Sequence, residues 1–505
     1  MPTYYQSKKR IDVSTETQIV VVTELPSWVD KRNMDNIEKW KNQNPNVQID
    51  ESDLIFPDSF GFTTECFFLT ARALHLGVIP LMTRLKKIIG EYQKLKERIK
   101  QIEGTPAGQN PMMIQQMKKV TEMAELQIEV LTVHLLDQNQ LKMMSEFYIF
   151  LSKWLVYQID PNNQGFPLPP PSVSYATLPE FLIEDMTNFF NFLLPFSPKI
   201  AYQLNLSELL PIIVYLVGSP PHCKNPYLRA HLVRILSDII LETERSRSTL
   251  IYTIFNSLTD KIVLNNLASV MMTFYVQVEV TGSHTQFYDK FNIRHDLQTI
   301  FKHMWQVPSL QDTIVAFSKS SQQDFLKFIS LVLNDANYLL EEALKYLHEA
   351  KTTEEQLRNR NDPDADYQQM EAEHARREGA IKSFLQLAKE TIHLLSSFTQ
   401  RIISPFLLPE VIDRIPGMIN YYFVELAEKA ETLLVDNPEK YQFNPDQLLG
   451  QLVDVYLNLN NKTFIDAVGR EGRSYKHSTF VKVANILRSS GIRNGVSFFL
   501  VNLFM

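Results

Sequence analysis

Two short stretches of the sequence bring together residue types that could do chemistry. His222 lies next to Cys223, a pairing that could bind a metal ion or supply a thiolate nucleophile. Ser283, His284 and Asp289 are the residue types of a hydrolytic triad. Neither group has the support that such chemistry needs, because no third metal ligand lies near His222 and a triad requires a fixed tertiary geometry. We favour a turn before a helix for His222 and Cys223, and we assign no catalytic residue.

The rest of the sequence contains no motif for a metal, a nucleotide or an activated nucleophile. It has no Walker loop, GxGxxG, HExxH, GxSxG or paired CxxC. The two cysteines, Cys66 and Cys223, are too few for a disulfide framework or a four-thiolate zinc site. Glycine supplies only 15 of the 505 residues, which argues against phosphate-binding loops and β-rich folds. We therefore expect no metal, no cofactor and a reducing compartment, the cytoplasm or the nucleus.

Charge and hydropathy argue against nucleic acid and membrane as partners. The chain has 50 basic and 57 acidic residues, whereas nucleic-acid-binding proteins are usually strongly basic. The longest apolar runs, 209–217 and 496–505, fall short of the roughly 20 residues that span a bilayer. The first residues lack the apolar core of a signal peptide, and we interpret the basic triplet at 8–10 as a solvated terminus rather than a nuclear-import signal.

The elements that must position these residues are predicted to be helices. Apolar residues recur every three or four positions along 85–102 and 117–135, with a Pro- and Gly-containing breaker at 105–111 between them. This pattern predicts an antiparallel helical hairpin. Basic residues dominate 84–100, for which we favour a solvated helix face over a surface that attracts an acidic partner.

Several helix starts carry capping signals. Asn225 and Asn444 each precede a proline, which predicts an N-cap followed by Pro at the first helical position. Thr177 with Glu180 three residues later predicts a capping box. Further helices are predicted at 264–280, 297–305, 325–347 and 382–408.

Three segments interrupt the helical pattern. Residues 160–171 are rich in proline, and we favour a connecting loop over a polyproline ligand. Residues 351–380 are highly charged, and we favour a solvated helical hairpin with a polar tip over an acidic interaction tail. Residues 1–60 are predicted to form a partly irregular arm, in which 17–23 is either a short strand or an extended segment. The predicted organisation is an arm at 1–60, a helical core at 61–487 and a tail at 488–505.

The length favours stacked helix pairs over a single globule. Single hydrophobic cores stop growing near roughly 250–300 residues, so a longer all-helical chain tends to extend. We therefore predict an all-α fold, an elongated helical-repeat stack, although the sequence shows no strict repeat.

Eight short motifs between Thr64 and Leu487 carry a resemblance to a known family. The most telling is 276–294, with the sequence VQVEVTGSHTQFYDKFNIR. The other seven lie at 64–76, 178–181, 225–228, 333–343, 418–421, 443–445 and 472–475. In this order they resemble the core of the ubiquitin conjugation (chain-elongation) factors of the U-box class.

The resemblance implies both a fold and a function. Members of the family have an elongated, armadillo-like helical core, and they extend ubiquitin chains on substrates that already carry ubiquitin, for proteasomal and ER-associated degradation. The implied partners are a ubiquitin-conjugating enzyme, ubiquitylated substrates, an AAA-type segregase and proteasomal shuttle proteins. The family's activity resides in a C-terminal U-box, which uses no metal or cofactor.

No U-box motif follows residue 487 in this sequence. We therefore expect a truncated form or a partial gene product, the core scaffold of a ubiquitin-ubiquitin ligase that is inactive in isolation. A non-enzymatic helical-repeat adaptor, competing with a full-length ligase, is the alternative that stays open. Because the U-box is the part that recruits the conjugating enzyme, the resemblance assigns no catalytic, cofactor-binding or metal-binding residue here.

Overall fold

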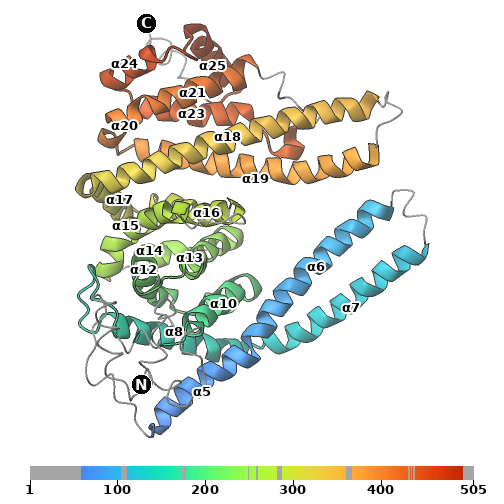
Figure 1. Cartoon of the computed structure of the whole chain (residues 1–505), viewed down its shortest axis with the longest axis vertical. Coiled ribbons are helices and arrows are strands. Elements are labelled where there is room, and N and C mark those ends of the chain that lie inside the picture. The colour runs from blue at the N-terminus through green and yellow to red at the C-terminus, as the bar shows by residue number, and fades with distance from the viewer. Residues whose placement is uncertain are drawn as a thin grey trace, which may run out of the picture. The chain divides into compact units, whose positions relative to one another are not determined.

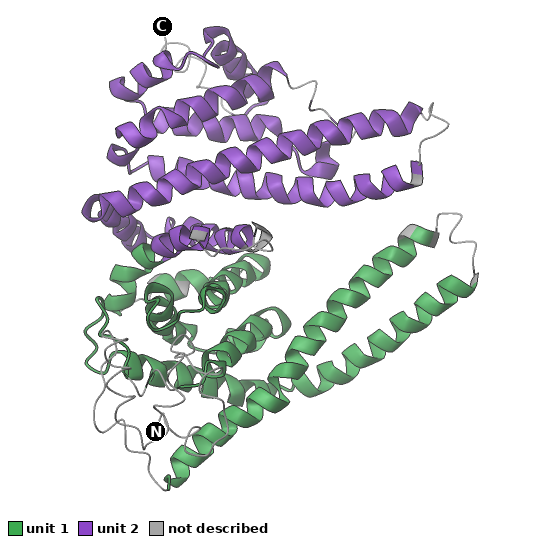
Figure 2. Cartoon of the chain, viewed as in Figure 1, with its two compact units in different colours: residues 1–270 green, residues 271–505 purple. Residues whose placement is uncertain are grey.

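The described part of the chain is helical almost throughout. The computed structural model describes residues 59–103, 111–172, 175, 178–247, 249–256, 260–280, 287–359, 367–429, 433, 435 and 438–492. Among these residues the extended backbone pairing is limited to isolated bridge positions at Ser172 and Pro179. The chain divides into two compact units, residues 1–270 and 271–505 (Figure 2). The predicted all-α helical stack is confirmed, and the possible strand at 17–23 lies outside the described residues.

Unit 1 contains the helices up to the first half of α15 (Figure 1). They are α5 (Phe62–Gly77), α6 (Ile79–Glu103), α7 (Pro111–Leu135), α8 (Gln138–Ile159), α10 (Phe181–Phe196), α11 (Pro198–Ala201), the 3₁₀ helix η3 (Leu206–Leu209), α12 (Leu210–Gly218), α13 (Pro226–Ser246), α14 (Leu250–Asn256) and α15 (Lys261–Gln277).

The predicted N-terminal helical hairpin is confirmed as α6 and α7, which pack side by side (Figure 1). Met82, Leu85 and Ile99 of α6 are buried. The basic positions of α6 are largely exposed, as both a solvated face and a surface for an acidic partner require, so the choice between them stays a prediction. Helix α7 also carries large apolar side chains that are more than half exposed: Met112, Val120, Met123, Leu126, Val130 and Val133.

One stretch of the described residues, Phe62–Lys100, is long and apolar enough by composition to cross a membrane, with 22% of its most apolar window buried. It contains no long continuous apolar run, because charged residues such as Glu65 and Arg72 interrupt it. Length and composition alone are weak evidence for a membrane span, since helices of a protein core pass the same test.

The proline-rich segment 160–171 is a non-helical connection, as predicted. Asp160, which directly follows α8, accepts hydrogen bonds from the backbone N–H groups of Gln164 at 3.0 Å and Gly165 at 2.7 Å. The hydroxyl of the buried Tyr215 donates to the same carboxylate at 2.8 Å. The start of the loop is therefore anchored to the core, which supports a connecting role.

Unit 2 contains the remaining helices (Figure 1). They are the 3₁₀ helix η4 (Val278–Val280), α16 (Phe287–Met304), α17 (Pro308–Ser320), α18 (Gln322–Asn359), α19 (Tyr367–Thr399), the 3₁₀ helix η5 (Ser404–Leu407), α20 (Pro409–Ile412), α21 (Arg414–Phe423), the π-helical η6 (Val424–Glu428), the 3₁₀ helix η7 (Pro438–Tyr441), α23 (Pro445–Asn458), α24 (Lys462–Arg470) and α25 (His477–Ser489).

The charged segment 351–380 belongs to a helical hairpin, as predicted. Its two arms, α18 and α19, are much longer than the charged part and pack along one another. Arg377 of α19 lies 3.9 Å from both Glu349 of α18 and Glu373 of its own helix. The charges thus lie on the distal half of a hairpin whose other half is buried core.

Two of the three predicted helix starts are confirmed. Asn225 and Asn444 are the N-caps of α13 and α23, and each is followed by proline. The predicted capping box is wrong in register: α10 starts at Phe181, so Glu180 is its N-cap rather than its third residue. Thr177 lies outside the described residues. The predicted helix at 382–408 ends earlier, at Thr399, and the short η5 follows it.

Candidate functional site

His222 and Cys223 form a buried turn, as predicted, and not a reactive pair. The Nδ1 atom of His222 lies 2.7 Å from the hydroxyl oxygen of Ser219, and both His222 and Cys223 are almost fully buried. Burial lowers the pKa of His222 to about 4 and raises the pKa of the Cys223 thiol to about 12. At neutral pH the ring is therefore uncharged and the thiol protonated, which is the opposite of a thiolate–imidazolium pair.

The other candidate group cannot be assembled from the described residues. Ser283 and His284 lie outside them, as does the side chain of Asp289. Across the described residues, no group of three or more His, Cys, Asp or Glu side chains could hold a metal ion.

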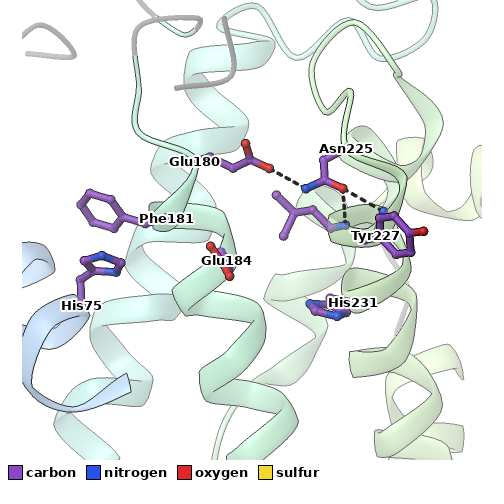
Figure 3. Close-up of a pocket in the computed structure, with 8 residues that line it drawn as sticks. His75, Glu180, Phe181, Glu184, Asn225, Tyr227 and His231 are labelled. Carbon is purple, nitrogen blue, oxygen red and sulfur yellow. Dashed lines mark hydrogen bonds between the residues drawn. The ribbon is translucent and has the colours of Figure 1, made fainter. Parts of the chain in front are cut away.

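A cleft of about 430 Å³ in unit 1 brings together three of the sequence motifs that carry the resemblance (Figure 3). His75 of the motif at 64–76 lines it from α5, Phe181 lines it from the start of α10, and Tyr227 lines it from the start of α13. We call this the α10–α13 cleft. The starts of α10 and α13 meet at this cleft. A helix start leaves backbone N–H groups that need partners, and here the capping residue of α13 also binds the residue before α10.

Asn225 ties the two helix starts together. Its side-chain oxygen accepts hydrogen bonds from the backbone N–H groups of Tyr227 at 3.0 Å and Leu228 at 3.4 Å, as an N-cap does (Figure 3). Its side-chain nitrogen donates to the Glu180 carboxylate at 2.9 Å. One residue therefore caps α13 and fixes the residue that precedes α10.

A histidine–carboxylate pair supports the same cleft from α5. The His75 ring stacks on Phe181, with ring centroids 4.2 Å apart, and its Nδ1 lies 3.0 Å from the Asp185 carboxylate. Asp185 is nearly fully buried. Burial raises its pKa to about 6, although the bond and the charge of His75 act in the opposite direction.

The α10–α13 cleft carries negative charge. The exposed carboxylate of Glu184 has no hydrogen-bonded or ion-paired partner among the described residues. On the facing wall, burial lowers the pKa of His231, a shift that Glu184 partly offsets. The carboxylates of this cleft are therefore not neutralised by a cationic side chain that lines it.

Unit 2 contains a second cleft, of about 610 Å³, where three other motifs meet. Asn334 lies in the motif at 333–343 on α18, Tyr421 in the motif at 418–421 on α21, and Arg473 in the motif at 472–475 after α24. We call this the α18–α21 cleft.

The turn that follows α24 is held by a single carboxylate. Glu471 accepts hydrogen bonds from the backbone N–H groups of Arg473 at 2.9 Å and Ser474 at 3.0 Å, and from the side-chain nitrogen of the buried Asn420 at 3.2 Å. Partial burial raises the pKa of Glu471, but these donors outweigh burial and lower it overall. The carboxylate is ionised at neutral pH and fixes the turn that carries Arg473.

The motif at 276–294 meets the motif at 333–343 in a buried ion pair. Arg294, 1% exposed, donates to the Asp335 carboxylate at 2.5 and 2.7 Å, and to Glu279 at 2.6 Å. The hydroxyl of the buried Tyr275 also donates to Asp335, at 2.5 Å. Asp335 is the neighbour in sequence of Asn334, so the network fixes the segment of α18 that lines the cleft.

The geometry of the two clefts defines a class of protein. Both clefts are lined by side chains fixed by caps, ion pairs and buried carboxylates, and their described residues include no nucleophile held next to a general base. The described chain is a helical scaffold with two built clefts.

Comparison with known proteins gives the family. The family model described as "Ubiquitin elongating factor core" matches residues 1–498, and the chain belongs to this family. It is 31% identical over 453 residues to the "Probable ubiquitin conjugation factor E4" of Arabidopsis thaliana, covering 86% of this chain and 43% of that protein. The "Ubiquitin conjugation factor E4" of Schizosaccharomyces pombe is 30% identical, with 86% and 45% covered. The "E4 ubiquitin-protein ligase UFD2" of Saccharomyces cerevisiae is 27% identical, with 85% and 49% covered. The chain thus spans less than half the length of these relatives.

Sequence reasoning found the motifs but missed that they converge. His75, Phe181 and Tyr227 are separated by about a hundred and by 46 residues, and nothing in their local pattern indicates that they face one space. The one available signal was that eight motifs, none of them a recognised catalytic motif, follow one another in the order of the family they resemble. Such motifs fit contact points between helices better than a reaction centre.

Proposed function

We propose that this chain is the core scaffold of a ubiquitin chain-elongation factor, which holds ubiquitylated substrates and the ubiquitin-conjugating machinery close together. The observation that carries the proposal is the family match over residues 1–498. Holding two reactants together raises their effective concentration without a new chemical group, which suits a scaffold that carries no reactive side-chain set in its described clefts.

The proposal extends to partners and location. The family resemblance suggests a ubiquitin-conjugating enzyme, ubiquitylated substrates, an AAA-type segregase and proteasomal shuttle proteins, with action in the cytoplasm and nucleus in proteasomal and ER-associated degradation. The names of the relatives support partners in the ubiquitin pathway in general. We propose that these 505 residues bind such partners but do not transfer ubiquitin by themselves.

A reconstituted reaction tests this proposal. The 505-residue chain is mixed with ubiquitin, activating enzyme, conjugating enzyme and a substrate that carries a short ubiquitin chain. We expect the 505-residue protein to co-purify with the ubiquitylated substrate and not with its unmodified form. We also expect it to leave the length of the ubiquitin chain unchanged. The full-length S. cerevisiae relative serves as the positive control for extension.

Two results would contradict the proposal. Robust chain extension by the 505 residues alone would show that they contain the transfer activity. Equal retention of ubiquitylated and unmodified substrate would show that they do not select ubiquitin chains. If the chain selects ubiquitylated substrate and also slows the full-length relative, it acts as a competitor, which is the adaptor reading of the same scaffold.

A further inference from the structure

The α18–α21 cleft has an unequal balance of hydrogen-bond donors and acceptors. Both of its carboxylates are engaged. Glu471 already accepts from the donors described above, and Asp413 lies 3.3 Å from a guanidinium nitrogen of Arg470. The Glu471 carboxylate is therefore occupied by the fold, and Asp413 already has a cationic partner.

Two arginines of the same cleft have no carboxylate partner among the described residues. Arg414 donates only to uncharged acceptors, the backbone oxygen of Ser330 at 3.2 Å and the side-chain oxygen of Asn334 at 2.8 Å. Arg473 is exposed, and its guanidinium makes no hydrogen bond or ion pair within the described part of the chain. A guanidinium stays charged at any physiological pH, so these are two cations of the cleft that no carboxylate contacts directly.

The amide side chains on α18 add further donors. The side-chain oxygen of Asn334 accepts from Arg414 at 2.8 Å, and the Tyr422 hydroxyl donates to the backbone oxygen of Asn337 at 2.7 Å, with the Asn337 side-chain oxygen 3.3 Å from the same hydroxyl. The NH₂ group of each amide is a donor that a ligand can use. Tyr421, 43% exposed, provides an aromatic wall beside these donors.

We propose that the α18–α21 cleft binds a linear acidic segment of a partner protein. The guanidiniums of Arg414 and Arg473 receive its carboxylates, because this pairing is charge-assisted and can be bidentate. The amides of Asn334 and Asn337 donate to its backbone carbonyls. The donors come from α18, α21 and the turn after α24, a distribution that suits an extended chain better than one small anion. The volume of about 610 Å³ lies within the roughly 300–1,000 Å³ typical of ligand sites.

Binding is measured with two labelled peptides and the full 505-residue chain. One peptide alternates Asp and Glu with Gly and Ser, and its counterpart has Asn and Gln at the acidic positions. We expect fluorescence anisotropy to show saturable binding of the acidic peptide only, weakening as salt is raised because the contacts are charged. Failure of the acidic peptide to bind more tightly than its counterpart would overturn the proposal.

Two pairs of matched variants locate the binding. Arg473→Gln is expected to weaken binding about tenfold, which corresponds to about 1.4 kcal/mol, whereas Arg376→Gln, the same change on the exposed face of α19, is expected to have no effect. A Cβ added at Gly417, which lines the cleft, meets nothing within 4 Å, so Gly417→Leu places its side chain in the cleft and is expected to abolish binding. Gly379→Leu, equally unobstructed on α19, is its control.

The specificity of the cleft is tested by competition. Circular dichroism first confirms that all variants keep the helical content of the wild type. Unchanged affinity of Arg473→Gln or Gly417→Leu, with the fold intact, would refute the assignment of binding to this cleft. Displacement of the acidic peptide by equal concentrations of inorganic phosphate or of a single-stranded oligonucleotide would overturn the assignment to acidic protein segments. Resistance to both competitors supports it.

Discussion

The two clefts have a similar construction but differ in which charged group lacks a partner. Each lies where helix starts and turns from distant parts of one unit meet, and each is lined by motifs on which the family resemblance was based. In the α10–α13 cleft, Glu184 is a carboxylate without a hydrogen-bonded or ion-paired partner among the described residues. In the α18–α21 cleft, Glu471 accepts hydrogen bonds from backbone donors, and the arginines are the charged groups without a carboxylate partner among the described residues.

The difference shows that the charge a cleft offers to a ligand depends on which of its charged groups already have partners within the fold. Counting charged residue types would make the α18–α21 cleft nearly neutral, since Asp413 and Glu471 match Arg414 and Arg473 in number. The carboxylates stay charged but are already engaged, by backbone donors at Glu471 and by Arg470 at Asp413, whereas the guanidiniums of Arg414 and Arg473 contact no carboxylate. A ligand pairs with the charged groups that have no partner, so identifying those groups predicts the ligand better than the net charge of the cleft does.

The buried carboxylates next to the two clefts differ in the same way. Asp185 in unit 1 pairs with His75, a ring whose charge depends on pH, whereas Asp335 in unit 2 pairs with Arg294, whose charge does not. This contrast predicts different responses of the two units to mutation and to pH.

The largest effect is expected from Arg294→Met. The change leaves the buried Asp335 without its cation, and removing one partner of a buried ion pair costs about 3–5 kcal/mol. Hydrogen exchange followed by mass spectrometry should show this loss of stability in peptides of unit 2 and leave those of unit 1 unchanged. The double variant Arg294→Met/Asp335→Leu should recover much of the loss; equal protection of wild type and single variant would contradict the role given to the pair.

The next effect is a pH dependence in unit 1. Burial raises the pKa of Asp185 from 3.8 to about 6 in the folded chain, against the opposing influence of His75. Since the folded state favours the protonated acid, the stability from this group is present below pH 3.8 and is lost as pH rises to about 6. The loss amounts to about 3 kcal/mol at most. Urea unfolding of wild type and Asp185→Asn should show a difference that falls with pH across this range, and a constant difference would exclude the linkage.

A smaller difference is expected between the two asparagine caps. Asn225 bonds two backbone N–H groups and also Glu180, whereas the Asn444 oxygen receives one N–H, from Gln447 at 3.0 Å. We expect Asn225→Ala to cost about 2 kcal/mol and Asn444→Ala about 1 kcal/mol of unfolding free energy. Serine at either position keeps a capping oxygen and serves as the control. A larger loss for Asn444→Ala would contradict the special role of Asn225 at the α10–α13 cleft.

The smallest effect concerns the negative charge of the α10–α13 cleft. Glu184 partly offsets the lowering of the His231 pKa that burial causes. Removing its charge with Glu184→Gln should therefore lower the pKa of His231 further, as followed by NMR titration of the ring protons. Glu97→Gln, at an exposed position of α6, should leave it unchanged. A rise of the His231 pKa in Glu184→Gln would contradict a carboxylate facing that ring.

Local signals predicted local features well. Proline and asparagine placed the starts of α13 and α23, apolar periodicity placed the hairpin of α6 and α7, and charge patterning indicated the hairpin at 351–380, because caps and helix faces depend on residues a few positions apart. The Thr177/Glu180 pattern failed in register at the start of α10, where Glu180 is the N-cap and its carboxylate accepts a hydrogen bond from Asn225. A capping pattern does not reveal a competing partner 45 residues away.

The sequence by itself determined that this protein is a helical chain without a recognisable reaction centre, and its ordered motifs identified the family. Those properties follow from composition, periodicity and short motifs, which are local. Only the tertiary structure decided that several of the motifs converge on two clefts, and that Asp185 pairs with His75 and Asp335 with Arg294. It also decided that the side chain of Glu471 is bound by donors of the fold, whereas that of Arg473 is not. These outcomes depend on burial and on partners distant in sequence, and both arise only when the helices pack.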